Sequence, residues 1–281
     1  MKKIMNFLTG ILTACLLWTL TSCGSTPETD ICVSIPPQAY LVKRIAGEET
    51  MLTVMIPPGS APPTYSPNAA QMRELHQSRL YIKIGHPDFL FEKKHIDPFL
   101  NKHPGVMVVD MADSVDIIPG DVHIWLSPAI MRINAERVYR KLAQLNPGKQ
   151  EMYLNNFRDL RQDIDSLDAK LRRMFEPHQG KAFMVLHPAL EYFCRDYGLK
   201  QVSIRKDNKA PSVKKIAELI EYARDKNIGA ILIQKEFSSE QLDVFSRETG
   251  AEVIVIDPLN TSWLENLYET ATILERVSNE Q

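Results

Sequence analysis

The sequence feature that most constrains the fold is an uninterrupted helical pattern from Gln150 to about Phe175. Apolar residues recur along it at steps of three and four, the period of one helix face, at Tyr153, Leu154, Phe157, Leu160, Ile164, Leu167, Leu171 and Met174. The stretch contains no glycine or proline. At about 1.5 Å per residue, such a helix spans roughly 40 Å, the width of a domain. The rest of the chain must therefore be arranged along one stiff helix.

Short apolar strands alternate with helical stretches on both sides of this helix. We predict strands at 31–35, 51–56, 80–84, 106–110, 182–186, 230–233 and 253–256, and helices at 38–46, 69–76, 128–145, 189–197, 212–226 and 239–249. This alternation is typical of parallel sheets covered by helices. We therefore predict an α/β fold of two lobes, each a mostly parallel sheet flanked by helices, joined by one long rigid helix. The predicted parts are an N-terminal lobe (31–149), a connecting helix (150–176) and a C-terminal lobe (177–281).

The N-terminus has the pattern of a secretion signal. Two lysines precede an apolar run from Phe7 to Leu20, which is too short to span a bilayer comfortably. The next residues, "LTSC", resemble a bacterial lipobox, in which the cysteine is lipidated and becomes the mature N-terminus. We therefore expect a signal peptide (1–22), lipidation at Cys23 and a polar tether (23–30). The alternative is an ordinary cleaved signal with an incidental cysteine. With the lipid, we expect the protein in the cell envelope, on the periplasmic or outer face of a membrane, and in contact with the membrane through the lipid only.

Composition excludes some functions. The chain carries 33 basic and 35 acidic side chains, for a formal net charge of −2. Nucleic-acid binding normally requires a clustered basic surface, so we expect no nucleic-acid partner. Beyond the signal, Cys32 and Cys194 fall in different predicted lobes, and we expect two buried thiols rather than a disulfide.

Three metal-competent side chains lie at or near the ends of predicted strands. His187 directly follows the strand at 182–186, and Asp257 directly follows the strand at 253–256. His123, in "GDVHIWLSP" (120–128), ends the loop after the strand at 106–110. A single histidine beside apolar residues is more often a hydrogen-bonded core residue than a ligand. Parallel sheets, however, place ligand-binding groups at the carboxyl ends of their strands, so three such residues in two lobes favour a metal site.

The motifs around these residues resemble those of a known family, the zinc- and manganese-binding (cluster A-I) solute-binding lipoproteins of bacterial metal ABC importers. The resemblance covers about 31–277 and rests on five motifs in order: "PPGSAPPTYSP", "GDVHIWLSP", "VLHPALEYFCRDYGL", "ILIQKEFS" and "VIDPL". It implies two α/β lobes, a rigid connecting helix and a metal held in the cleft between the lobes.

The resemblance also implies four ligand positions, of which His123, His187 and Asp257 are present here. Pro63 occupies the position of the family's first-loop histidine, and proline has no donor atom in its side chain. We consider His86 and Glu92, which follow the strand at 80–84, as replacements for the missing ligand.

Other residues near these motifs have subordinate expected roles. Tyr65 is a less favoured replacement ligand than His86 or Glu92. Asp121 is interpreted as the residue that orients His123, and the alternative is a solvated loop carboxylate. The chain also departs from the family pattern at Ser127, where the motif has Asp, and at Gln234, where many members have Glu.

These residues favour zinc, which accepts imidazole and carboxylate ligands with water in a fourth position. Two histidines make Mn²⁺ less suitable, because manganese prefers more oxygen ligands. We therefore expect a monomeric subunit, not an enzyme, that binds zinc and delivers it to an ABC permease. One alternative is a degenerate relative with weak or no metal binding that acts as a surface interaction protein. Another is a zinc hydrolase, although the sequence contains no "HExxH" or paired-carboxylate motif.

Overall fold

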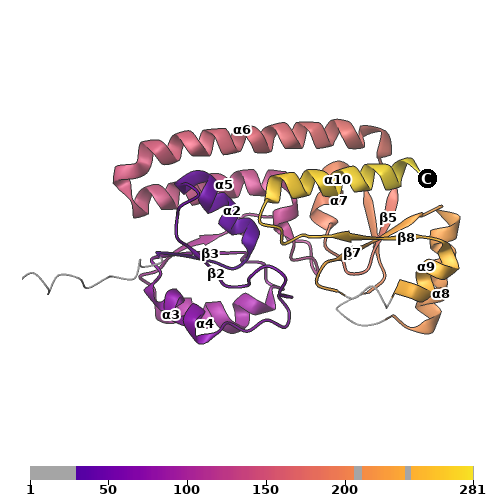
Figure 1. Cartoon of the computed structure of the whole chain (residues 1–281), viewed down its shortest axis with the longest axis horizontal. Helices are drawn as coiled ribbons and strands as arrows, with labels where there is room; N and C mark the ends of the chain where they lie inside the picture. Colours follow the sequence, from indigo (N-terminus) through magenta and orange to yellow (C-terminus); the bar gives the residue numbers. More distant parts are fainter. Residues whose placement is uncertain (1–29, 206–210, 238–241, 281) are drawn as a thin grey trace, which may run out of the picture.

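The structure is a computed structural model that describes residues 30–205, 211–237 and 242–280. The expected signal peptide, Cys23 and nearly all of the expected tether lie outside these residues. Two four-stranded sheets lie side by side, and one long helix runs along both of them (Figure 1). All strand pairs are parallel. The predicted fold class, two parallel α/β lobes joined by a long helix, is confirmed.

The N-terminal sheet has the strand order β2-β1-β3-β4. Its strands are short and its inner two, β1 and β3, are almost completely buried, because helices cover the sheet. Its strands are β1 (Ile31–Val33), β2 (Thr53–Val54), β3 (Leu80–Lys83) and β4 (Met107–Asp110). The accompanying helices are α2 (Pro36–Ala46), α3 (Ala69–Gln77), the π-helix η1 (Glu92–Ile96), α4 (Asp97–Lys102), the 3₁₀-helix η2 (Ile124–Leu126) and α5 (Pro128–Leu145).

The C-terminal sheet has the order β6-β5-β7-β8 and is covered by helices on both faces. Its strands are β5 (Ala182–Val185), β6 (Lys200–Ser203), β7 (Ala230–Gln234) and β8 (Glu252–Ile256). Its helices are α7 (Glu191–Tyr197), α8 (Val213–Asp225), α9 (Asp243–Thr249) and α10 (Trp263–Asn279). The sequence analysis missed β6, because this edge strand reads "KQVS" and is only partly buried.

The long helix α6 (Gln150–Phe175) has the predicted bounds and contains 26 residues. Short 3₁₀ turns flank it, η3 (Pro147–Lys149) and η4 (Glu176–His178). Its apolar stripe packs on α5 and α2 in the first lobe, and α10 returns from the second lobe to lie beside it (Figure 1). Helix α6 is therefore part of the core of both lobes.

The two lobes are also joined directly, at a seam between Trp125 and the C-terminal lobe. Trp125 Nε1 donates to the carbonyl oxygen of Pro258 (2.8 Å), and Trp263 Nε1 donates to the carbonyl oxygen of Trp125 (2.7 Å). One hydrophobic cluster continues through both lobes. Cys32 and Cys194 are buried free thiols, as expected. Within the described ranges, no helix is both long enough and apolar enough to cross a membrane.

Candidate functional site

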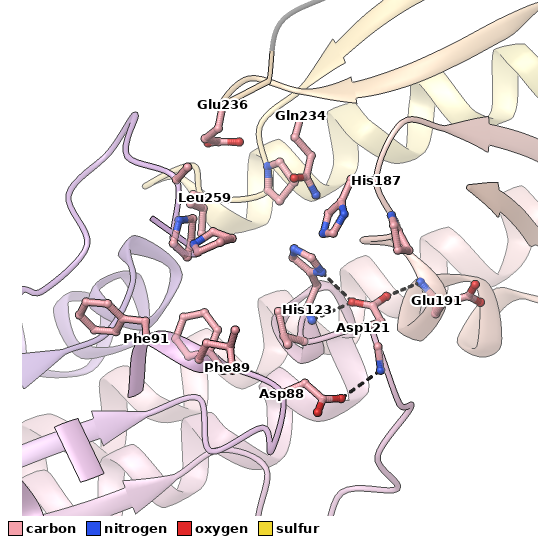
Figure 2. Close-up of a pocket in the computed structure, with 18 of the residues that line it drawn as sticks. Asp88, Phe89, Phe91, Asp121, His123, His187, Glu191, Gln234, Glu236 and Leu259 are labelled. Carbon is pink, nitrogen blue, oxygen red and sulfur yellow. Dashed lines mark hydrogen bonds and ion pairs between the residues drawn. The ribbon is translucent and has the colours of Figure 1, made fainter. Parts of the chain in front are cut away.

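A pocket of about 660 Å³ lies between the lobes, at the carboxyl ends of both sheets (Figure 2). The first lobe contributes loop residues 61–63, 88–91 and 118–123 to its wall, and the second lobe contributes 187–188, 234, 236–237 and 258–259, among others. This is the position at which parallel sheets present ligand-binding groups. His123 and His187 both line the pocket, one from each lobe.

The imidazole of His123 is held in one orientation by Asp121. Asp121 Oδ1 accepts hydrogen bonds from His123 Nδ1 (2.6 Å) and from the His123 backbone N–H (2.8 Å). Because a carboxylate only accepts, Nδ1 carries a proton, and in the neutral imidazole Nε2 then has the lone pair. Burial raises the pKa of Asp121, but His123 and the donated hydrogen bonds outweigh burial and leave that pKa below its usual value. The expected contact between the two side chains is thus present, and it fixes the orientation of the imidazole.

The His187 ring faces His123 from the end of β5. The two ring centroids are 6.0 Å apart and the ring planes meet at 72°. With each nitrogen about 2.0–2.1 Å from a zinc ion, two imidazoles with centroids about 5–6 Å apart can share that ion. Burial first, and then the charge of His123, lowers the pKa of His187 to about 4. His187 is therefore neutral at physiological pH and available to bind a metal.

The structure shows two carboxylates beyond the ends of β7 and β8. Asp257 follows β8 but does not line the pocket. Its Oδ1 accepts from the Leu259 backbone N–H (3.2 Å), and its Oδ2 lies 3.6 Å from Lys235 Nζ. Glu236 does line the pocket, and its buried Oε1 has no hydrogen-bond partner among the described residues. Burial, followed by the charge of Asp257, raises the pKa of Glu236.

Sequence analysis did not identify Glu236 as a site residue. It lies two positions beyond the end of β7, in "QKE" (234–236). In this stretch the sequence analysis named only Gln234, at the strand end. The usable signal was a carboxylate just beyond a parallel strand, the same signal that singled out Asp257. Gln234 itself lines the pocket and is buried.

Comparisons with known proteins agree with the two-lobed fold. Residues 31–277 match the model of a family described as "Zinc-uptake complex component A periplasmic" (ZnuA). The chain belongs to this family. A "putative metal-binding protein" of Chlamydia trachomatis is 27% identical over 253 residues, covering 86% of this chain and 89% of the relative. The "high-affinity zinc uptake system protein ZnuA" of Bacillus subtilis is 22% identical, covering 89% and 87%. A crystal structure of ZnuA superimposes with a TM-score of 0.82 at 29% identity, covering 89% of this chain and 99% of that one.

In this ZnuA-family chain, Glu92, one of the replacement ligands considered from the sequence, is engaged by groups of its own lobe. Its Oε1 accepts from the Ile84 backbone N–H (2.6 Å) and from the Ser34 hydroxyl, and its Oε2 accepts from the Gly85 backbone N–H (2.8 Å). The side chain is buried beneath the loop after β3 and does not line the pocket. Its environment raises its pKa to about 7, chiefly through burial. Glu92 is thus a structural brace for that loop.

The other replacement candidates are also outside the pocket wall. His86 Nδ1 accepts from the Asp88 backbone N–H (3.0 Å), and its buried Nε2 has no hydrogen-bond partner among the described residues. The Tyr65 hydroxyl donates to Gln71 Oε1 (2.8 Å). Pro63, in contrast, does line the pocket rim. Within the described residues, no group of three histidine, cysteine, aspartate or glutamate side chains is arranged to hold a metal ion.

Proposed function

We propose that this ZnuA-family protein captures a divalent transition metal in the pocket between its lobes and delivers it to an ABC permease. The observation that carries the proposal is the pair of imidazoles, His123 and His187, which face each other from opposite lobes. Asp121 fixes the lone pair of one, and burial keeps the other neutral. Such a pair binds metal without requiring a proton to leave first.

Zinc is the metal that this donor set suits best. Two imidazoles and one carboxylate are ligands that zinc prefers, whereas manganese favours more oxygen atoms. The names of the Bacillus subtilis relative and of the matching family refer to zinc uptake. We propose His123, His187 and one carboxylate of the second lobe as ligands. Glu236 is supported by its place on the pocket wall, and Asp257, the carboxylate expected from the sequence, is the alternative.

We further propose that the protein works as a monomer in the cell envelope, anchored through a lipid on Cys23. The lipobox-like "LTSC" supports the anchor. Labelling of producing cells with a palmitate analogue tests it: the parent should be labelled and a Cys23→Ala variant should not. A transport subunit, not an enzyme, is the role that the family supports.

The degenerate relative with weak or no metal binding remains the second candidate. Pro63 and the lack of three gathered ligands in the described residues are the observations that favour it. Metal analysis of protein purified without a histidine tag, followed by competition with a chelator of known affinity, distinguishes the two. We expect one zinc per chain, loss of binding in His187→Ala and severe weakening in His123→Ala. Zinc-free protein with no measurable affinity would support the degenerate relative.

A further inference from the structure

The pocket is much larger and more apolar than a single metal ion requires. A water molecule in the liquid occupies about 30 Å³, so an ion with a few waters fills a small part of the 660 Å³ cavity. Cavities of roughly 300–1,000 Å³ are typical of sites for small organic molecules. Much of the wall is apolar, with Phe89, Leu90, Phe91, Phe237 and Leu259 among its members. An apolar wall favours a carbon-containing ligand over a hydrated ion.

The protein's own donor atoms are too few to surround a metal. His123 and His187 provide two nitrogens, and Glu236 provides one carboxylate. Position 63 on the pocket rim is a proline, which offers no side-chain donor. A zinc ion held by protein alone in a closed site takes four ligands. The remaining coordination must therefore come from outside the chain.

Gln234 indicates what kind of molecule provides it. Its side chain is only 7% exposed and lines the pocket, and its Nε2 has no hydrogen-bond partner among the described residues. An amide N–H cannot bind a cation; it needs an oxygen acceptor, and leaving it unpaired when buried is unfavourable. The unpaired Nε2 therefore suits a carboxylate group of the ligand placed beside Gln234.

We propose that the cargo is a zinc ion already held by a small organic chelator that bears a carboxylate, such as an amino or hydroxy carboxylic acid. The chelator completes the coordination that His123, His187 and Glu236 leave open. Its carboxylate accepts from Gln234 Nε2, and its carbon atoms lie against the apolar wall. This inference rests on the proposed function, because it names the form in which the metal arrives.

Native mass spectrometry and calorimetry of the purified protein test the proposal, with zinc alone, zinc with citrate and zinc with L-histidine as probes. We expect a ternary mass of protein, zinc and one chelator, and at least tenfold tighter binding of one such complex than of zinc alone. If the protein bound one zinc ion and both chelators only competed for that zinc, the chelator proposal would be overturned and the proposed function would stand. No binding of zinc in any form would overturn both.

Gln234 variants test the recognition step separately. Gln234→Leu removes the amide donor and should weaken binding of the zinc–chelator complex more than binding of zinc alone. The ratio of the affinity for the complex to the affinity for zinc alone should fall about tenfold. Gln162→Leu makes the same change on the exposed face of α6 and should leave both affinities unchanged. Gln234→Glu places a carboxylate in the pocket, so it should favour zinc alone and repel the chelator. If the ratio of the two affinities, for the zinc–chelator complex and for zinc alone, were the same in the parent and both Gln234 variants, the chelator's carboxylate would not bind Gln234.

Discussion

Asp121 links a candidate metal ligand to the opposite lobe. Its Oδ1 holds His123 Nδ1 at 2.6 Å, while its Oδ2 accepts from the backbone N–H of Glu191, at the start of α7, at 2.8 Å. The carboxylate is almost completely buried, so both contacts are shielded from water. A single side chain therefore orients the imidazole and helps to hold the two walls of the pocket in register.

Asp121→Asn should weaken zinc binding without unfolding the protein. An amide can satisfy only one of the two neighbours with its oxygen, and its NH₂ group then opposes another donor. Loss of such an orienting partner typically costs about 10–100-fold in metal affinity. Competition with a chelator of known affinity measures the effect. Asp113→Asn, in an exposed loop, is the matched control. Identical affinities in the parent and Asp121→Asn would mean that His123 needs no orienting group.

Glu236→Gln should weaken zinc binding more than Asp257→Asn. Glu236 lines the pocket with a buried oxygen that has no partner among the described residues, whereas Asp257 is paired with Lys235 outside the pocket wall. Each substitution changes a carboxylate to an amide. A difference in zinc affinity between the two variants therefore reflects the position of the carboxylate. The measurement is zinc affinity by the same competition assay. A larger loss in Asp257→Asn would restore Asp257 as the ligand expected from the sequence.

Pro63→His should strengthen the binding of zinc alone by roughly tenfold, about 1.4 kcal/mol. Pro63 lines the pocket rim, so an imidazole there can reach a metal held by His123 and His187. Thr64→His is the control, because Thr64 is exposed, adjacent and absent from the pocket wall. Isothermal titration under one competing chelator compares them. If both variants gained equally, the effect would come from an added surface histidine and not from completion of the site.

Two buried groups should give the metal-free protein opposing pH dependences. The His187 pKa falls from 6.5 to about 4, so only the unfolded chain gains this proton between these values, and stability is lost as pH falls. The Glu92 pKa rises from 4.5 to about 7, so only the folded chain keeps its proton in that window, and this contribution is lost as pH rises. The free energy of unfolding can be measured in urea between pH 4.5 and 7. In His187→Gln it should fall less toward acid pH than in the parent. Glu92→Gln should lower stability overall and reduce the loss toward neutral pH. If the free energy of unfolding changed with pH in both variants as it does in the parent, this account would be contradicted.

Metal binding should change the overall shape little. Helix α6 runs without interruption through the core of both lobes, and the Trp125 seam joins them near the pocket. A hinge would require one of these connections to bend or separate. Small-angle scattering of metal-free and zinc-loaded protein should therefore nearly superimpose. A clear change in the radius of gyration would show that the lobes close on the metal.

Much of the fold was readable from the sequence because its signals are periodic. The long helix and α5 have the bounds that their apolar spacing and the proline at position 128 predict. Strand β6 was missed because "KQVS" lies at a sheet edge, where only part of each side chain is buried and no apolar run is needed. Periodicity detects burial, so it fails where an element is held mainly by backbone hydrogen bonds.

The site was harder to read because ligand chemistry depends on where a side chain points. The strand-end rule pointed to His187, which lines the pocket, and the contact between Asp121 and His123 is the one interpreted from the sequence. Glu92 has a suitable carboxylate, but backbone amides of its own lobe use both of its oxygens. Glu236 was missed because it lies two residues beyond its strand, whereas Asp257 follows its strand directly. Only the three-dimensional structure distinguishes these two glutamates.

The Trp125 seam gives the protein a built-in optical reporter. The chain has three tryptophans, and Trp18 belongs to the expected signal peptide. The two that remain, Trp125 and Trp263, are joined at the seam, and the Trp125 ring lies 5.0 Å from that of His123. Both tryptophans of the described residues therefore lie at this seam, and Trp125 also lines the pocket. Arrival and departure of cargo can be followed by intrinsic fluorescence, in real time and without an added label.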